Sequence, residues 1–151
     1  MNKVLRPDCK PSVLFFCFAA LVVIGFYSAG CKKKAADVVP NVYVDINIFT
    51  TDPAFSPLNV IGGFAYYNGG SKGILIYRKS QNEFMAYDRN CTYKALDGNV
   101  ITVDASGITA ADAVCGSQFR ITDGAVNHSP AVNPLKRYQT SFDGTTLHIF
   151  N

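Results

Sequence analysis

The chain has 151 residues, of which 48% are hydrophobic and 13% aromatic, so it can bury one core and is not expected to be disordered. Its formal net charge is +3, but much of the basic charge lies in and beside an N-terminal apolar segment, and the remaining body is mildly acidic. Nucleic-acid binding requires basic charge spread over a folded face. The composition therefore argues against a nucleic-acid partner.

Residues 1–30 have the pattern of a secretory signal. A basic head is followed by an unbroken apolar run from Val13 to Gly30, which ends in small residues. Cys31 comes next, in a context similar to the lipobox of bacterial lipoproteins, where this cysteine carries the lipid. We therefore expect a lipoprotein signal peptide at 1–30, and lipid attachment at Cys31 followed by a linker at 31–41.

Two alternatives stay open for this segment. About 18 apolar residues just reach bilayer length, so the segment could be an uncleaved single-pass anchor, and ordinary secretion is also compatible with it. All three readings place residues 42–151 outside the cytoplasm. In the favoured reading the protein is anchored by lipid to a bacterial membrane, on the periplasmic or outer-membrane side of the cell envelope.

Residues 42–151 have the pattern of an all-β domain. Apolar and polar residues alternate with a period of two between Gly, Pro, Asn and Asp turns, and no long helical period is present. Strands are expected at 41–48, 58–67, 74–78, 83–87, 99–103, 117–121, 137–142 and 145–150, with mixed strand and loop at 108–114. About eight to ten short strands are typical of a small sandwich or barrel.

Two loops of this body each carry a cysteine. Cys91 follows the strand at 83–87, and Cys115 comes just before Gly116 and Ser117, at the beginning of the strand at 117–121. Loops of this kind can face each other across one site. No catalytic constellation is evident: acidic residues are scattered singly, no phosphate-binding loop is present, and Ser117 is interpreted as a turn residue that hydrogen-bonds the loop backbone.

The order of these features resembles the Rieske iron–sulfur fold. The resemblance lies in residues 84–91, 115–119, 123–126, 129–131 and 134–135 and in the hairpin at 143–144. In that family two loops hold a two-iron, two-sulfur cluster, through Cys-x-His in the first loop and Cys-x-x-His, followed by Gly-Ser, in the second. The resemblance implies a small Rieske-like β-sandwich or barrel with two cysteine-bearing loops.

The resemblance also assigns residues to the four ligand positions. Cys91 stands at the first Cys position and Tyr93 at the first His position, while Asp112 and Cys115 stand at the second Cys and second His positions. A Rieske cluster needs two thiolates on one iron and two imidazoles on the other. We therefore expect no cofactor at this degenerate cluster site, with a two-iron, two-sulfur cluster of altered ligation as the alternative.

Loops that are similar to cluster-binding loops should bring Cys91 and Cys115 close enough for a disulfide in an oxidising compartment. A further alternative is a zinc or copper site made by Cys91, Cys115 and His128. His128 comes just before the segment with Pro130, which covers the cluster in Rieske proteins.

The favoured function is that of a non-catalytic envelope lipoprotein. Its metal-free Rieske-like domain would be a binding or accessory module for a protein or small molecule that the sequence does not identify, clamped by the Cys91–Cys115 disulfide. The alternative is electron transfer by an altered cluster.

Overall fold

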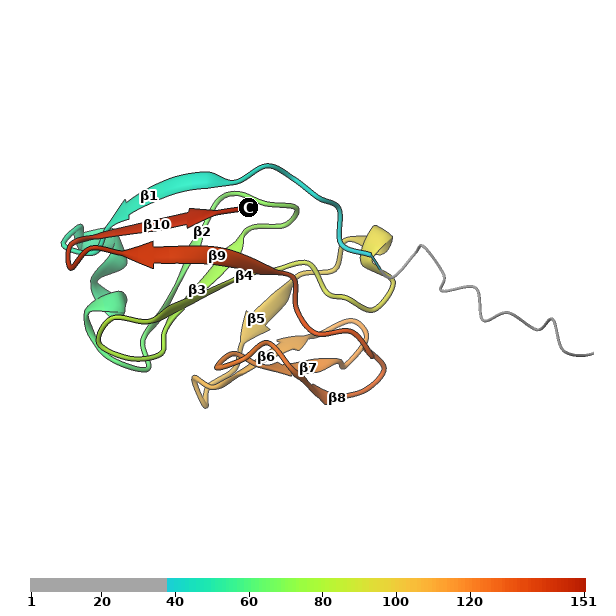
Figure 1. The fold of residues 1–151 in the computed structure, drawn as a ribbon. Coiled ribbons are helices and arrows are strands. Elements are labelled where there is room, and N and C mark those ends of the chain that lie inside the picture. Colours follow the sequence, from blue (N-terminus) through green and yellow to red (C-terminus); the bar gives the residue numbers. More distant parts are fainter. Residues whose placement is uncertain (1–37) are drawn as a thin grey trace, which may run out of the picture. The chain divides into compact units, whose positions relative to one another are not determined.

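The computed structural model describes residues 38–151, which form ten strands and two short 3₁₀ helices (Figure 1). The predicted signal segment, the lipid-attachment residue Cys31 and most of the linker lie outside the described residues. Within residues 38–151, no helix has the length and apolar character needed to cross a membrane. The prediction of an all-β body is confirmed.

The strands form two antiparallel sheets. The larger has the order β1 (Asp45–Phe49), β10 (Thr146–Phe150), β9 (Arg137–Phe142), β4 (Phe84–Asp88), β3 (Ile74–Arg78) and β2 (Phe64–Tyr67). The smaller has the order β5 (Ile101–Val103), β6 (Thr109–Asp112), β7 (Gln118–Arg120) and β8 (Val126–His128). In sequence, the smaller sheet is an insertion between β4 and β9, which pair with each other in the larger sheet (Figure 1).

Strands β3 and β4 of the larger sheet are buried on both faces. Because successive side chains of a strand point to opposite faces, β3 contributes to two cores: Ile74 and Ile76 to one, and Leu75 and Tyr77 to the other. The second core also contains Ile101, Ala110 and Phe119 of the smaller sheet, together with Cys91. The first cysteine loop is therefore fixed where residues of the two sheets pack together.

One predicted strand begins later than expected. The segment predicted as a strand at 58–67 opens with the end of the 3₁₀ helix η2 (Pro53–Asn59), and only Phe64–Tyr67 is extended. Asp52 caps the helix by accepting a hydrogen bond from the Ala54 N–H at 2.9 Å, and proline occupies its first turn. These local signals outweigh the apolar run that resembled a longer strand.

A buried carboxylate joins β4 to the neighbouring turn and to β9. Asp88, which is fully buried, accepts hydrogen bonds from the backbone N–H groups of Ser71 (2.6 Å), Lys72 (3.3 Å) and Asn90 (2.9 Å) and from the Tyr138 hydroxyl (2.7 Å). Four donors compensate for the removal of this carboxylate from water. The network fixes the chain where β4 ends and the first cysteine loop begins.

This network gives a test with a matched control. Tyr138→Phe should lower the free energy of unfolding by about 1–3 kcal/mol, because the buried carboxylate of Asp88 loses a donor. The hydroxyl of Tyr87 is also buried but has no hydrogen-bond partner among residues 38–151, so Tyr87→Phe should leave stability unchanged or raise it. Urea denaturation of the two variants measures the difference, and equal losses would contradict this account of Asp88.

Candidate functional site

The first cysteine loop is held by backbone and side-chain hydrogen bonds. It leaves β4 after Asp88, and the Cys91 N–H donates to the carbonyl of Asn99 at 2.9 Å. The hydroxyl of Thr92 donates to the carbonyl of Asn133 at 2.6 Å, which connects the loop to the segment before β9. Cys91 itself is fully buried in the second core. Its sulfur therefore has a fixed position.

The second cysteine loop is a tight turn between β6 and β7. One carboxylate oxygen of Asp112, Oδ1, accepts hydrogen bonds from the N–H groups of Val114 (2.8 Å) and Cys115 (3.2 Å). The Asp112 carbonyl accepts from the N–H of Gly116 at 2.9 Å, and Gly116 has a φ of +79°, which glycine adopts without strain. An aspartate followed closely by glycine is a sequence pattern that favours this kind of turn.

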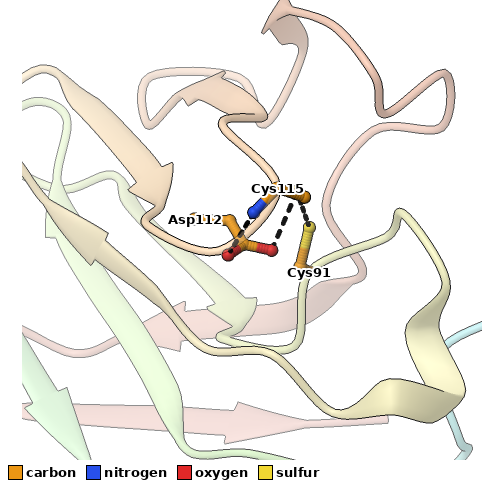
Figure 2. A group of neighbouring side chains, drawn as sticks. All are labelled: Cys91, Asp112 and Cys115. Atoms are coloured by element: carbon orange, nitrogen blue, oxygen red, sulfur yellow. Dashed lines mark hydrogen bonds between the residues drawn. The ribbon is translucent and has the colours of Figure 1, made fainter.

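The two loops bring three polar side chains together (Figure 2). The Cys115 sulfur lies 3.7 Å from the Cys91 sulfur, and the Cys115 thiol donates a hydrogen bond of 2.9 Å to Oδ2 of Asp112. One potential metal-ligand atom from each residue lies within 4.8 Å of the others. Cys91 and Asp112 are buried, whereas Cys115 is half-buried. We call these three residues the Cys-Asp-Cys group.

Ser117 connects the Cys-Asp-Cys group to the segment that contains Ala131. Its buried hydroxyl oxygen accepts a hydrogen bond from the Ala131 N–H at 2.9 Å and lies 3.0 Å from the Cys115 sulfur. Ser117 therefore joins the second cysteine loop to the backbone of the segment that contains Ala131.

A cavity of about 330 Å³ lies next to the half-buried cysteine. It is lined by Tyr93, Lys94, Asp97, Asn99, Val114, Cys115 and Pro130. Three of the predicted site residues, Tyr93, Cys115 and Pro130, thus share one cavity, to which both cysteine loops contribute. The other two members of the Cys-Asp-Cys group, Cys91 and Asp112, are buried and are not among the lining residues.

The group combines a protonated thiol with an ionised carboxyl. Burial, followed by a hydrogen bond with Asp112, raises the pKa of Cys91 to about 12. Burial also disfavours the Asp112 carboxylate, but hydrogen bonds from Cys115, from Cys91 and from two backbone N–H groups outweigh it, so the pKa of Asp112 is below its ordinary value. At neutral pH the reduced site therefore contains the Cys91 thiol and the Asp112 carboxylate.

The predicted disulfide is not formed in this structure. Both cysteines are free thiols with their sulfurs 3.7 Å apart, whereas a disulfide has a length of about 2.05 Å. The bond stays a prediction for the oxidised protein.

The structure gives a different third partner for the two cysteines. His128 was expected to join them in the alternative metal site, but its Nδ1 lies 3.3 Å from the carbonyl of Gly116, and Asp112 stands next to the sulfurs instead. The other histidine of the sequence, His148, lies in β10, and its Nε2 is 2.7 Å from Oδ1 of Asp45 in the neighbouring strand β1. The resemblance placed Asp112 at a degenerate ligand position, but the sequence analysis did not include it among the possible metal ligands. The aspartate followed by Gly116, which favours a turn at this position, was the available signal.

No protein-family model matches the sequence, and neither does any curated protein. Among solved structures, the chain is similar to the plasma-membrane Rieske protein of the cyanobacterium Synechocystis PCC 6803, with a TM-score of 0.55 and 18% identity over 70% of this chain and 99% of that one. A chain from the complex of reduced oxygenase and oxidised ferredoxin in carbazole 1,9a-dioxygenase has a TM-score of 0.47 and 17% identity, over 74% of this chain and 94% of that one. The first similarity confirms the predicted Rieske-like fold.

The difference between the two thiols can be measured by alkylation. In fully reduced protein at neutral pH, iodoacetamide should modify Cys115 first, because Cys91 is buried and its raised pKa leaves it protonated. Cys91 should react only when denaturant unfolds the chain, or increasingly as the pH rises toward 12. Peptide mass spectrometry identifies the modified residue, and equally fast alkylation of both cysteines in the native protein would contradict this account.

Proposed function

We propose that this chain, whose body has a Rieske-like fold, is a non-catalytic lipoprotein of the cell envelope with a metal-free binding or accessory domain. The observation that carries the proposal is the composition of the Cys-Asp-Cys group, which offers two thiols and a carboxylate but no histidine. A Rieske cluster is held by two thiolates on one iron and two imidazoles on the other. The residues that face each other across these loops do not fit that cluster.

A disulfide between Cys91 and Cys115 would link the two cysteine loops covalently, in the place where a cluster links them in Rieske proteins. The sulfurs are 3.7 Å apart, so they need to approach by about 1.7 Å to reach bonding distance. An oxidant of the envelope would accept the two electrons as both thiol protons are released. Closing a loop of about 25 residues stabilises a fold by about 3 kcal/mol in the chain-entropy model. The bond would thereby clamp the two loops to each other.

The cavity beside Cys115 supports a binding role. Its wall combines the aromatic ring of Tyr93 and the apolar side chains of Val114 and Pro130 with polar and charged groups, which are those of Lys94, Asp97 and Asn99. Mixed walls of this kind, with both apolar and polar groups, suit a small polar molecule or a short segment of a partner protein.

The place of action is the surface of a bacterial membrane. The anchor would be the diacyl lipid on Cys31 that the sequence predicts. A diacyl group buries enough methylenes to hold a protein stably on a bilayer.

Electron transfer by a cluster of altered ligation is the second candidate. The observation in its favour is the similarity of the fold to a Rieske protein. In that case the cluster would be bound by the two thiolates of Cys91 and Cys115, and by ligands other than imidazole on the second iron.

Analysis of the full chain purified without oxygen separates these two functions. We expect a colourless preparation without iron or acid-labile sulfide. After exposure to air, non-reduced peptides should contain Cys91 linked to Cys115, and reduction should lower the free energy of unfolding by about 3 kcal/mol. The double variant Cys91→Ser/Cys115→Ser is the control, since reduction should not affect it. A brown protein with two irons and two sulfides per chain would overturn the proposed function in favour of the second candidate.

The lipid anchor has its own test. Wild-type protein expressed in a bacterium should partition into the detergent phase of a Triton X-114 extract and carry a diacylglycerol on Cys31. Cys31→Ala should prevent lipidation, because it removes the thiol that receives the lipid. Mass spectrometry of the N-terminal peptide distinguishes a lipidated cysteine from an uncleaved anchor, and an unmodified Cys31 in membrane-bound wild-type protein would contradict lipoprotein processing.

A further inference from the structure

The spacing of the Cys-Asp-Cys group matches the ligand spacing of a tetrahedral metal ion. Two thiolates that each lie about 2.3 Å from a tetrahedral zinc ion are about 3.8 Å from each other. The sulfurs of Cys91 and Cys115 are 3.7 Å apart. A thiolate and a carboxylate oxygen on the same ion are about 3.5 Å apart by the same geometry. The Cys115 sulfur and Oδ2 of Asp112 are now 2.9 Å apart, so they need to separate by about 0.6 Å.

We propose that the reduced protein binds one zinc ion through the sulfurs of Cys91 and Cys115 and the carboxylate of Asp112. The inference limits the metal-free state of the proposed function to the oxidised protein. It rests on that function in one respect, namely that these loops hold no iron–sulfur cluster.

The chemistry of the donors favours zinc over other common ions. Zinc accepts both thiolate and carboxylate ligands, whereas magnesium and calcium require oxygen donors and copper(I) favours sulfur alone. On binding, the thiols of Cys91 and Cys115 each release a proton to solvent as the two sulfur–zinc bonds form. The hydrogen bond that Asp112 now accepts from Cys115 is replaced by an oxygen–zinc bond. No electron is transferred in this step.

The loops hold these donors in place before any ion arrives. Oδ1 of Asp112 accepts two backbone N–H groups, which leaves Oδ2 directed at the sulfurs (Figure 2). The Cys91 N–H donates a hydrogen bond to the carbonyl of Asn99. The hydroxyl of Ser117 lies 3.0 Å from the Cys115 sulfur and would remain beside it as an outer contact. Contacts of this kind orient metal ligands and strengthen binding.

The group supplies three ligands, and the fourth position is assigned to the cavity beside Cys115. Three protein ligands with one open position are the arrangement by which zinc binds water or an external ligand. The cavity of about 330 Å³ has room for a small anionic or sulfur-containing ligand there.

Zinc and the disulfide exclude each other, because both use the same two sulfurs. The ion would therefore occupy the reduced form, and the disulfide the oxidised form.

Cobalt(II), which replaces zinc in tetrahedral sites and reports thiolate ligands by its absorption, is the probe. Reduced, metal-free full-length protein under argon should bind one cobalt ion per chain, with sulfur-to-cobalt charge-transfer bands, and one equivalent of zinc should displace it. Air-oxidised protein should bind none.

Asp112→Asn should weaken cobalt binding roughly tenfold or more, because even outer contacts of a metal site are worth 10–100-fold. Asn keeps an oxygen for the turn, so the loop should still form.

Two controls test the ligand set. Asp97→Asn changes a carboxylate that lines the cavity outside the group, and His128→Ala removes the nearby imidazole; both should bind cobalt like the wild type. Cys91→Ser should remove a thiolate from the spectrum, which tests the site independently if Asp112→Asn does not fold. The proposal is overturned by the absence of thiolate bands in the reduced wild type, or by a folded Asp112→Asn protein of unchanged affinity. If either result is obtained with protein that contains no cluster, the zinc site is wrong and the proposed function still stands. If the purified chain contains iron and sulfide, the proposed function is wrong, whatever the cobalt titration gives.

Discussion

The carboxylate of Asp112 is the group on which the arrangement of the site depends. One oxygen accepts hydrogen bonds from the N–H groups of Val114 and Cys115 and so closes the turn between β6 and β7. The other oxygen accepts a hydrogen bond from the thiol of Cys115. The turn places the Cys115 sulfur 3.7 Å from that of Cys91, which the second core holds from the other side. Ser117 then connects the same turn to Ala131. A single buried side chain thus shapes the loop and completes the group of donors that the loop presents.

The Rieske-like frame and its donors point to different conclusions about function. The frame of two antiparallel sheets is similar to the fold of a solved Rieske protein. The donors are two cysteines and an aspartate, which is not the set that holds a Rieske cluster. Function depends on the chemistry of a site and not on the fold that carries it. We therefore base the proposed function on the donors, which favour a sulfur–sulfur bond when oxidised and a zinc ion when reduced.

Much of the fold could be predicted from local patterns, because strands alternate with a period of two and turns carry Gly, Pro, Asn or Asp. The hairpin of β9 and β10 around Asp143 and Gly144 is of this kind. The pattern misjudged residues 58–63, where Pro57 and the positive φ of Gly62 impose a 3₁₀ helix and a turn on an apolar run. At the site, the resemblance led to Cys91, Asp112 and Cys115 one by one. The resemblance also predicted that the loops of Cys91 and Cys115, which are 24 residues apart, approach each other. It did not predict that Asp112 joins the two sulfurs in place of His128, because that contact depends on how the turn of the second loop folds.

The most direct measurement is a crystal structure of the air-oxidised full chain, with anomalous diffraction data collected on both sides of the iron absorption edge. We predict continuous density between the sulfurs of Cys91 and Cys115 at about 2.05 Å, with no anomalous peak between the two loops. Two anomalous peaks between these loops that vanish below the iron edge would contradict the central claim.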